Sequence, residues 1–224
     1  MSKVFKRFNW RKAPPRKLSC GAFLDVHEYQ VRHEFTDGSH GSFYKVEAAC
    51  PPCLDAVVLV IFTPGPPAQI LLRKGMRPAA ALRTIIQLPK GSNTSFPDIY
   101  WELPAGGVEA DDWLKDGALA FRAKKEGWEE TGLHLQASNF FTLGPSPFPT
   151  SAFSPERLHF MAIKLPEATP LLHAPPGDGH PMEEGSSVEW VDITTAYQWC
   201  RHGQIIDSKT ELGIRRLIDF LADK

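Results

Sequence analysis

The segment Trp101–Leu133 constrains the fold more than any other part of this 224-residue chain. The residues at its beginning, Tyr100–Leu103, are followed by Pro104 and the pair Gly106-Gly107. Because proline and paired glycines break regular structure, the pattern predicts a short strand followed by a glycine loop. A loop of this kind lets the backbone approach a ligand closely.

A helix is predicted directly after this loop. Residues 118–126 are mostly strong helix formers, and Gly132 lies where a helix of this length should end. Asp116 lies near the start, where a capping side chain is expected. The segment as a whole therefore predicts a strand, a glycine loop and a helix in that order.

Three carboxylates of the predicted helix, Glu126, Glu129 and Glu130, are spaced so that they stack on one face. Like charges at this spacing repel each other, so the helix gains from them only when a cation lies between them. A hard divalent cation suits oxygen ligands, and magnesium commonly keeps water ligands and contacts substrate phosphates. The residues therefore indicate metal-assisted attack on a phosphate compound, and a solvated acidic helix face is the alternative.

This segment resembles the signature of the Nudix hydrolases. That signature runs glycine, five residues, glutamate, seven residues, and then Arg-Glu-apolar-x-Glu-Glu-x-Gly-apolar. Gly106 matches the opening glycine. The matches at the other end are Glu126, Glu129, Glu130, Gly132 and Leu133. The resemblance extends over about residues 57–221.

The chain departs from the signature at several positions. Asp112 stands where the first glutamate is expected, Lys125 replaces the arginine, and Gly127 replaces an apolar residue. The spacer between Asp112 and Lys125 is about five residues longer than the signature, and a loop tolerates such extra length. The residues around the glutamates resemble the branch of the family that hydrolyses nucleoside diphosphate sugars.

Composition agrees with one compact enzyme domain and an N-terminal extension. Hydrophobic residues make up 42% of the chain and the formal net charge is −1, which gives no indication of nucleic-acid or membrane binding. No apolar run is long enough to span a bilayer. The residues before Asp25 are basic without the hydrophobic segment of a secretory signal, so we expect a frayed terminus of a cytoplasmic protein. An organellar presequence and an RNA-binding arm are the alternatives.

The N-terminal part predicts a hairpin layer. Phe23–Val31 and Ser42–Ala48 have the pattern of strands, and the turn residues 36–39 separate them. A lone hairpin is not stable in water, so this layer must pack on another surface. We therefore divide the chain into residues 1–53, a basic arm and hairpin layer, and residues 54–224, the hydrolase-like domain.

Strands and helices alternate through the rest of the chain. The predicted strands are Asp55–Thr63, Gln69–Lys74, Leu158–Leu165 and Val188–Asp192, and the predicted helices are Thr195–His202 and Leu212–Leu221. This order predicts an α/β fold. The resemblance implies an α/β/α sandwich with a mixed sheet, to which the antiparallel hairpin layer is added.

The resemblance also implies a magnesium site, with manganese as an alternative metal. Its ligands would be the Ala105 carbonyl, Glu126 and Glu130, with Glu129 in the same cluster. The metal would neutralise charge on the phosphates and lower the pKa of an attacking water.

The general base is implied to lie on the loop 177–187, which is rich in glycine and can therefore move. Glu184 is the first candidate and Glu183 the second, with His180 weaker and Glu129 of the helix as a further alternative. A solvated acidic loop without a catalytic role remains open for this segment.

Candidate substrate-binding residues come from three other segments. Arg73 and Arg77 resemble the arginines of ADP-ribose and sugar-nucleotide pyrophosphatases, and a forked guanidinium suits a diphosphate. An ion pair with Glu102 is the alternative for these arginines. Glu102 and Glu156 complete the candidate set, and Glu156 belongs to a segment similar to Pro-Gly-x-Ser-x-Glu-Arg of the same group.

The resemblance thus implies Mg²⁺-dependent hydrolysis of ADP-ribose or a related nucleoside diphosphate sugar to a nucleoside monophosphate and a sugar phosphate. It also implies a homodimer in which the N-terminal layer contacts the second subunit. Two alternatives stay open: a Nudix-like module that binds nucleotide sugars without hydrolysing them, and a Nudix hydrolase that acts on UDP-glucose or RNA ends.

Overall fold

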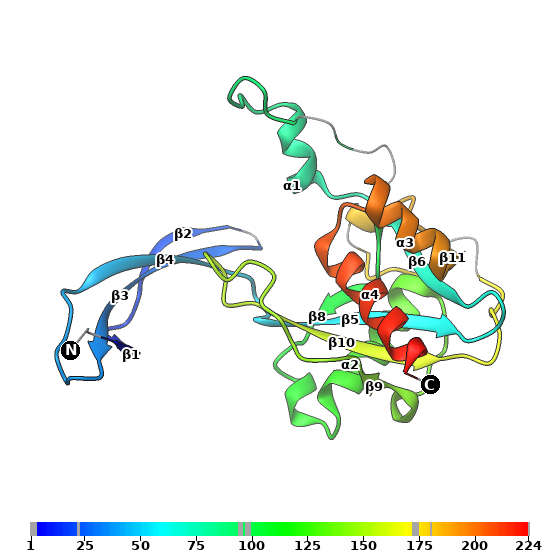
Figure 1. Cartoon of the computed structure of the whole chain (residues 1–224), viewed down its shortest axis with the longest axis horizontal. Helices are drawn as coiled ribbons and strands as arrows, with labels where there is room; N and C mark the ends of the chain where they lie inside the picture. The colour runs from blue at the N-terminus through cyan, green and yellow to red at the C-terminus, as the bar shows by residue number, and fades with distance from the viewer. Residues whose placement is uncertain are drawn as a thin grey trace. The chain divides into compact units, whose positions relative to one another are not determined.

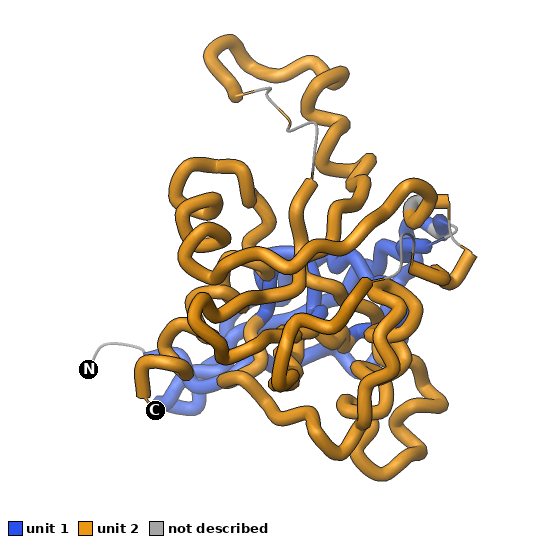
Figure 2. The backbone as a smooth tube through the Cα atoms, turned by 90° about the vertical axis from the view of Figure 1, so that its right-hand side faces the viewer, with its two compact units in different colours: residues 1–54, 148–157 blue, residues 55–147, 158–224 orange. Residues whose placement is uncertain are grey.

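The computed structural model describes residues 4–21, 23–93, 96, 100–171, 175–179 and 181–223. The chain divides into two compact units, which Figure 2 shows in different colours. The first unit comprises residues 1–54 and the later segment 148–157, and the second comprises residues 55–147 and 158–224.

The first unit contains a four-stranded antiparallel sheet (Figure 1). Its strands are β1 (Phe5–Trp10), β2 (Arg16–Cys20), β3 (Asp25–Phe35) and β4 (Tyr44–Cys50). β3 pairs with each of the other three strands. Gly38 has a φ of 81° in the turn between β3 and β4, a conformation that favours glycine. The segment 148–157 is tied to β4 because the Ala49 N–H donates to the Phe153 carbonyl at 2.7 Å.

The basic N-terminal segment forms β1 and β2, so the expectation of a frayed terminus was wrong. Glu34 of β3 is buried and lies 2.9 Å from both Lys6 Nζ and Arg7 Nε. The Asn9 side-chain amide donates a further hydrogen bond of 2.8 Å to the same carboxylate. Bonds from Lys6, Asn9 and Arg7 lower the pKa of Glu34 to about 2. Lys6 and Arg7 therefore attach β1 to β3, although their side chains remain 52% and 64% exposed.

The second unit is built on a seven-stranded sheet. Its strands are β5 (Asp55–Thr63), β6 (Gln69–Gly75), β7 (Tyr100–Glu102), β8 (Ala105–Gly107), β9 (Phe141–Thr142), β10 (Arg157–Lys164) and β11 (Ser187–Asp192). The main order is β11-β6-β5-β10-β9, with β7 paired to β6 and β8 paired to β5.

The sheet is mixed. The pairs of β6 with β5, β7 and β11 are antiparallel, as are β5 with β8 and β9 with β10. By contrast, the N–H of Arg157 donates to the Leu54 carbonyl and the N–H of Leu165 donates to the Phe62 carbonyl. Residue numbers rise together along this pair, so β5 and β10 are parallel.

Helices cover both faces of the seven-stranded sheet. The helices are α1 (Pro78–Ala81), α2 (Ala118–Thr131), α3 (Ile193–His202) and α4 (Ser208–Ala222), and 3₁₀ turns occupy Leu82–Thr84, Asp112–Leu114, Ala137–Asn139 and Pro181–Glu183. The buried even-numbered residues of β5 pack in one apolar cluster with α3 and α4. Its odd-numbered residues 57, 59 and 61 pack in a second cluster with α2.

Because β5 is buried on both faces of the sheet, its sequence is a continuous run of apolar residues. The arrangement confirms the predicted α/β class with a mixed sheet. Among the described residues, no helix combines the length and the apolar character needed to cross a membrane.

A hydrogen-bonded series joins three segments of the second unit. The His159 imidazole of β10 lies 2.6 Å from Asp55 Oδ1 through Nε2 and 2.8 Å from Ser146 Oγ through Nδ1. The imidazole therefore links the beginning of β5 to the segment that follows β9, next to the points where the chain passes between the two units.

Candidate functional site

The glycine loop and the helix predicted from the sequence are present, and glycines define both ends of the helix. Gly117 precedes α2 with a φ of 69°, and Gly132 follows it with a φ of 72°. The Gly132 N–H closes the helix on the Trp128 carbonyl at 2.9 Å. Asp116 is not the cap, because Gly117 occupies that position and no side chain caps the helix there. The positive φ at this residue favours glycine over the predicted aspartate.

The carboxylates of α2 meet the glycine loop of β8. Glu126 and Glu130 are buried, and Glu129 is half-buried. The Ala105 N–H donates to Glu130 Oε2 at 2.7 Å. A Cβ atom at Gly106 would overlap the Glu126 carboxylate, so only glycine allows this close approach. The loop and the helix are therefore fitted to each other through two of the three glutamates.

Each glutamate of the helix lies near a different cation. Glu126 Oε1 is 2.6 Å from Arg122 Nη2, Glu129 Oε1 is 3.8 Å from Lys125 Nζ, and Glu130 Oε1 is 3.7 Å from Arg73 Nε. Within the described ranges, no three acidic, histidine or cysteine side chains converge as a metal site requires. The glutamates are thus paired with cations in this arrangement.

Burial dominates the ionisation of two of these carboxyls. Loss of solvent raises the pKa of Glu126 to about 7 against the opposing effect of Arg122. It also raises the pKa of Glu130 to about 7 against the opposing effect of Arg73. The negative charges of neighbouring carboxylates add to both shifts. The cations therefore compensate only part of the cost of burying these groups.

Glu102 of β7 organises a second cluster of charges. It is fully buried, and three cations surround it: Arg73 Nη1 at 2.9 Å, Arg77 Nη2 at 2.6 Å and Lys209 Nζ at 2.9 Å. Burial acts to raise the pKa of Glu102, but Lys209 and Arg77 hold it below its usual value. The ion pairs between Glu102 and both arginines, one of the two sequence interpretations, are present.

The two arginines differ in their access to a ligand. The Arg73 side chain is 4% exposed and lies between Glu102 and Glu130, whereas the Arg77 side chain is 34% exposed. Arg77 is therefore the better placed of the two to contact a substrate from solvent. Glu156, the remaining candidate, is half-buried in the first unit, where its N–H donates to Ser154 Oγ at 3.2 Å.

The loop that carries the candidate bases is attached to α2. The Gly177 N–H donates to the Glu129 carbonyl at 2.8 Å, and the Asp178 N–H donates to Glu183 Oε2 at 2.6 Å. Burial raises the pKa of Glu183 and the Asp178 side chain adds to this shift, whereas the hydrogen bond from the Asp178 N–H and the charge of Arg73 oppose it. Glu184 is exposed. His180 lies outside the described residues.

Sequence reasoning missed several members of the two charge clusters. Arg122 donates to Glu109 Oε1 at 2.7 Å in addition to its contact with Glu126, and Lys209 reaches both Glu102 and Asp207. Asp207 precedes a helix and accepts the Thr210 N–H, a capping pattern visible in the sequence. Its proximity to Glu102 depends on residues more than a hundred positions apart, which no local pattern reveals.

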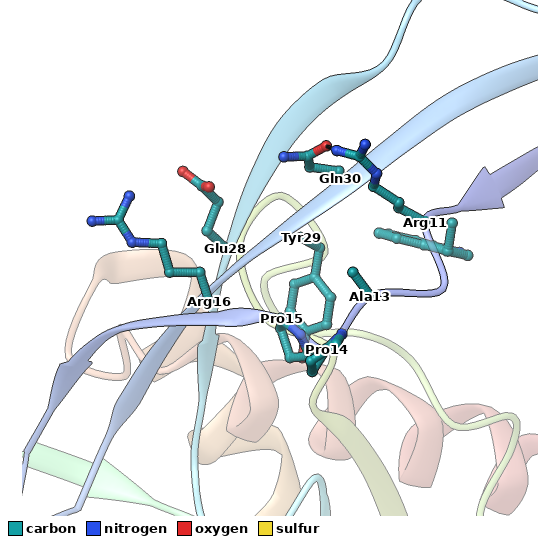
Figure 3. A pocket seen from close by; sticks show the side chains of 9 residues that line it. Arg11, Ala13, Pro14, Pro15, Arg16, Glu28, Tyr29 and Gln30 are labelled. Atoms are coloured by element: carbon teal, nitrogen blue, oxygen red, sulfur yellow. Dashed lines mark hydrogen bonds between the residues drawn. The ribbon is translucent and has the colours of Figure 1, made fainter.

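Two hollows lie in the first unit, and neither is lined by a predicted site residue. The smaller one, of about 100 Å³, is shown in Figure 3 beside the connection between β1 and β2. Tyr29 and Pro15 are part of its wall, together with Trp10. The larger hollow, of about 530 Å³, is lined in part by Asp25, His27 and Cys50.

No protein-family model matches this chain, and no curated protein shows significant similarity to it. The resemblance to Nudix hydrolases therefore depends on the residues of the loop and the helix and on their arrangement.

The raised pKa of Glu126 leads to a prediction for the metal-free protein. Between about pH 4.5 and 7 the folded state retains a proton that the unfolded state releases, so stability falls as the pH rises through this window. Glu126→Gln mimics the protonated form. In EDTA at pH 8 we expect the variant to unfold at a higher temperature than the wild type, with little difference at pH 5.

Thermal unfolding of both proteins at the two pH values measures this effect. Glu167→Gln, which changes an exposed carboxylate, serves as the control and should match the wild type at both pH values. A Glu126→Gln protein that is less stable than the wild type at pH 8 would contradict the prediction.

Proposed function

We propose that this protein is a Mg²⁺-dependent hydrolase of the Nudix type that cleaves the diphosphate bond of ADP-ribose or a related nucleoside diphosphate sugar. The observation that carries the proposal is the contact between the glutamate face of α2 and the glycine loop of β8. The mixed sheet between α2 on one face and α3 and α4 on the other supports the finer assignment to the Nudix sandwich.

The donor chemistry fits a hard divalent cation. Glu126, Glu129, Glu130 and the Ala105 carbonyl offer only oxygen atoms, which magnesium and manganese prefer. Glu126 Oε1 is buried beside the Arg122 guanidinium at 2.6 Å, in a contact without the angles of a directed hydrogen bond, so a bound cation would have to replace this contact. A bound Mg²⁺ would supply charge neutralisation at the phosphates and a more acidic water.

The chain's own residues would hold and orient the substrate. Arg77, about one third exposed and fixed on Glu102, would bind the diphosphate through the free edge of its guanidinium. Arg73 would stay buried and keep Glu102 and Glu130 in place. Glu183, whose proton affinity is raised and which lies within the electrostatic reach of Arg73, would take the proton from the attacking water.

A binding module without catalysis is the second candidate function. The three glutamates form ion pairs with Arg122, Lys125 and Arg73. These pairs favour the second candidate, because glutamates that are already paired with cations can have a structural role without binding a catalytic metal. A panel of ADP-ribose, UDP-glucose, dinucleoside polyphosphates, CoA and capped RNA, each incubated with Mg²⁺, separates these functions. Hydrolysis of none of them, together with binding of a nucleotide sugar, would favour the binding module.

The first functional prediction concerns Glu130. Glu130→Gln keeps the size of the side chain and removes its charge, so we expect turnover to fall by at least about a hundredfold while the fold persists. Hydrolysis of the best substrate of the panel at saturating Mg²⁺ measures the loss, and circular dichroism checks the fold. Glu167→Gln is the matched control, and activity of the Glu130 variant within a few-fold of wild type would disprove the metal assignment.

The second functional prediction compares the two glutamates of the base loop. Glu183 is fixed by the Asp178 N–H, whereas Glu184 is exposed. We therefore expect Glu183→Gln to lower kcat strongly with little change in KM, and Glu184→Gln to have the smaller effect. The reverse order would assign the base to Glu184, as the sequence resemblance alone implies. A pH–rate profile provides the decisive readout, because loss of the base removes the limb that rises with pH.

The third functional prediction concerns the homodimer. Phe5, Phe8 and Trp10 of β1 are about half exposed and form ring contacts along the strand, so the first unit presents an aromatic surface. We expect a second copy of the chain to cover this surface. Light scattering should give twice the mass of the 25.0 kDa chain, and Phe8→Asp should give the monomer.

The control for the dimer is Leu114→Asp, which places the same charge at an exposed apolar residue of the second unit. It should leave the mass unchanged. A wild-type protein that is monomeric at micromolar concentration would exclude the dimer.

A further inference from the structure

Arg122 connects three carboxylates at the beginning of the glutamate face. Its Nη1 donates to Glu109 Oε1 at 2.7 Å and lies 3.7 Å from Asp112 Oδ2. Its Nη2 lies 2.6 Å from Glu126 Oε1. Arg122, Asp112 and Glu126 are all buried, whereas the Glu109 side chain is 54% exposed. One guanidinium therefore compensates two buried acids and reaches a third acid at the surface.

The contacts of Arg122 with Glu109 and Glu126 are of different kinds. The contact with Glu109 has the geometry of a hydrogen bond. The contact with Glu126 Oε1 is a close ion pair of 2.6 Å whose angles are not those of a directed hydrogen bond. Arg122 thus supplies charge to Glu126, and its directed bond points toward Glu109.

We propose that Arg122 is a built-in counter-ion that compensates Glu126 in the metal-free protein, and that a divalent cation binds by displacing it from Glu126 toward Glu109 and Asp112. The inference rests on the proposed function in one respect, namely that Glu126 is a metal ligand. It goes beyond that function because it assigns a role to Arg122 and Glu109, which the signature does not provide at these positions, and a role as partner of Arg122 to Asp112, which stands where the signature has a glutamate.

The physical reason is the cost of buried charge. A carboxylate buried without a partner is strongly destabilising, so the metal-free protein needs a cation beside Glu126. A divalent ion at the same oxygen repels the guanidinium, and both cannot occupy its immediate surroundings. Glu109 and Asp112 lower the cost of this displacement, because Arg122 keeps a bond to one and remains close to the other.

The test measures binding of Mn²⁺ alone by calorimetry at fixed pH and salt. Arg122→Met removes the competing charge, and we expect it to bind Mn²⁺ about tenfold more tightly than the wild type. Lys124→Met is the matched control. It removes an exposed cation from the same helix, so screening by solvent should limit the change to about twofold.

A reciprocal pair of variants tests the role of the surface acid. Glu109→Gln removes the charge toward which Arg122 is displaced, so Mn²⁺ should bind about fivefold more weakly than to the wild type. Asp111→Asn removes the same charge from an exposed neighbour, and it should bind Mn²⁺ like the wild type. Glu109 is exposed, so this pair decides the question even when Arg122→Met fails to fold.

The outcomes distinguish the proposed metal site from the proposed role of Arg122 as its counter-ion. A wild-type protein that binds no Mn²⁺ overturns the proposed metal site and, with it, the role of Arg122. A wild type that binds Mn²⁺, with Arg122→Met binding it equally well or more weakly, leaves the metal site in place and overturns only the counter-ion. Equal effects of Glu109→Gln and Asp111→Asn also overturn it, because net charge alone then explains the change.

Discussion

Buried carboxylates determine how the charged residues of the second unit are arranged. An ion that loses its water costs several kcal/mol unless a partner compensates it. Glu102 is fully buried and has three cations within hydrogen-bonding distance, whereas Glu130 has Arg73 at 3.7 Å and a backbone N–H at 2.7 Å. The pKa values follow this difference in compensation: that of Glu102 is lowered, and that of Glu130 is raised to about 7. The well-compensated carboxylate is suited to a structural role, and the poorly compensated one is the better candidate for a ligand of a further cation.

The backbone around the glutamates is shaped by the same requirement. A Cβ at Gly106 would overlap the Glu126 carboxylate, so a larger residue there would force this side chain to move. Gly127, within α2, faces the Leu135 side chain, which a Cβ would approach to 2.7 Å. The signature has an apolar residue at this position, and the close contact with Leu135 gives a packing reason for the glycine here. The helix accepts the lower intrinsic propensity of Gly127 because the burial of its neighbours compensates for it.

The sequence predicts those elements that local signals define. β5 has the predicted bounds Asp55–Thr63, and α2 ends at the predicted Gly132, because an apolar run and a glycine with positive φ are properties of short segments. β1 was missed because its apolar and charged residues do not alternate regularly: the pairing with β3 shifts register between Phe5 and Arg7. α4 begins at Ser208, before the predicted Leu212, since Asp207 supplies a cap ahead of the apolar stripe.

The sequence predicts which types of residue form the candidate site, but it does not predict which acid pairs with which cation. The glutamates of α2 follow from helical spacing, but the partners of Arg73 come from three different elements. Arg73 lies on β6, bonds to Glu102 of β7, approaches Glu130 of α2 and opposes the raised pKa of Glu183 on the loop before β11. The charge of Arg73 therefore acts on both Glu130 and Glu183 and opposes the raised pKa of each. The acid that would face a metal and the acid that would accept a proton thus share one cation, whose side chain has almost no access to solvent.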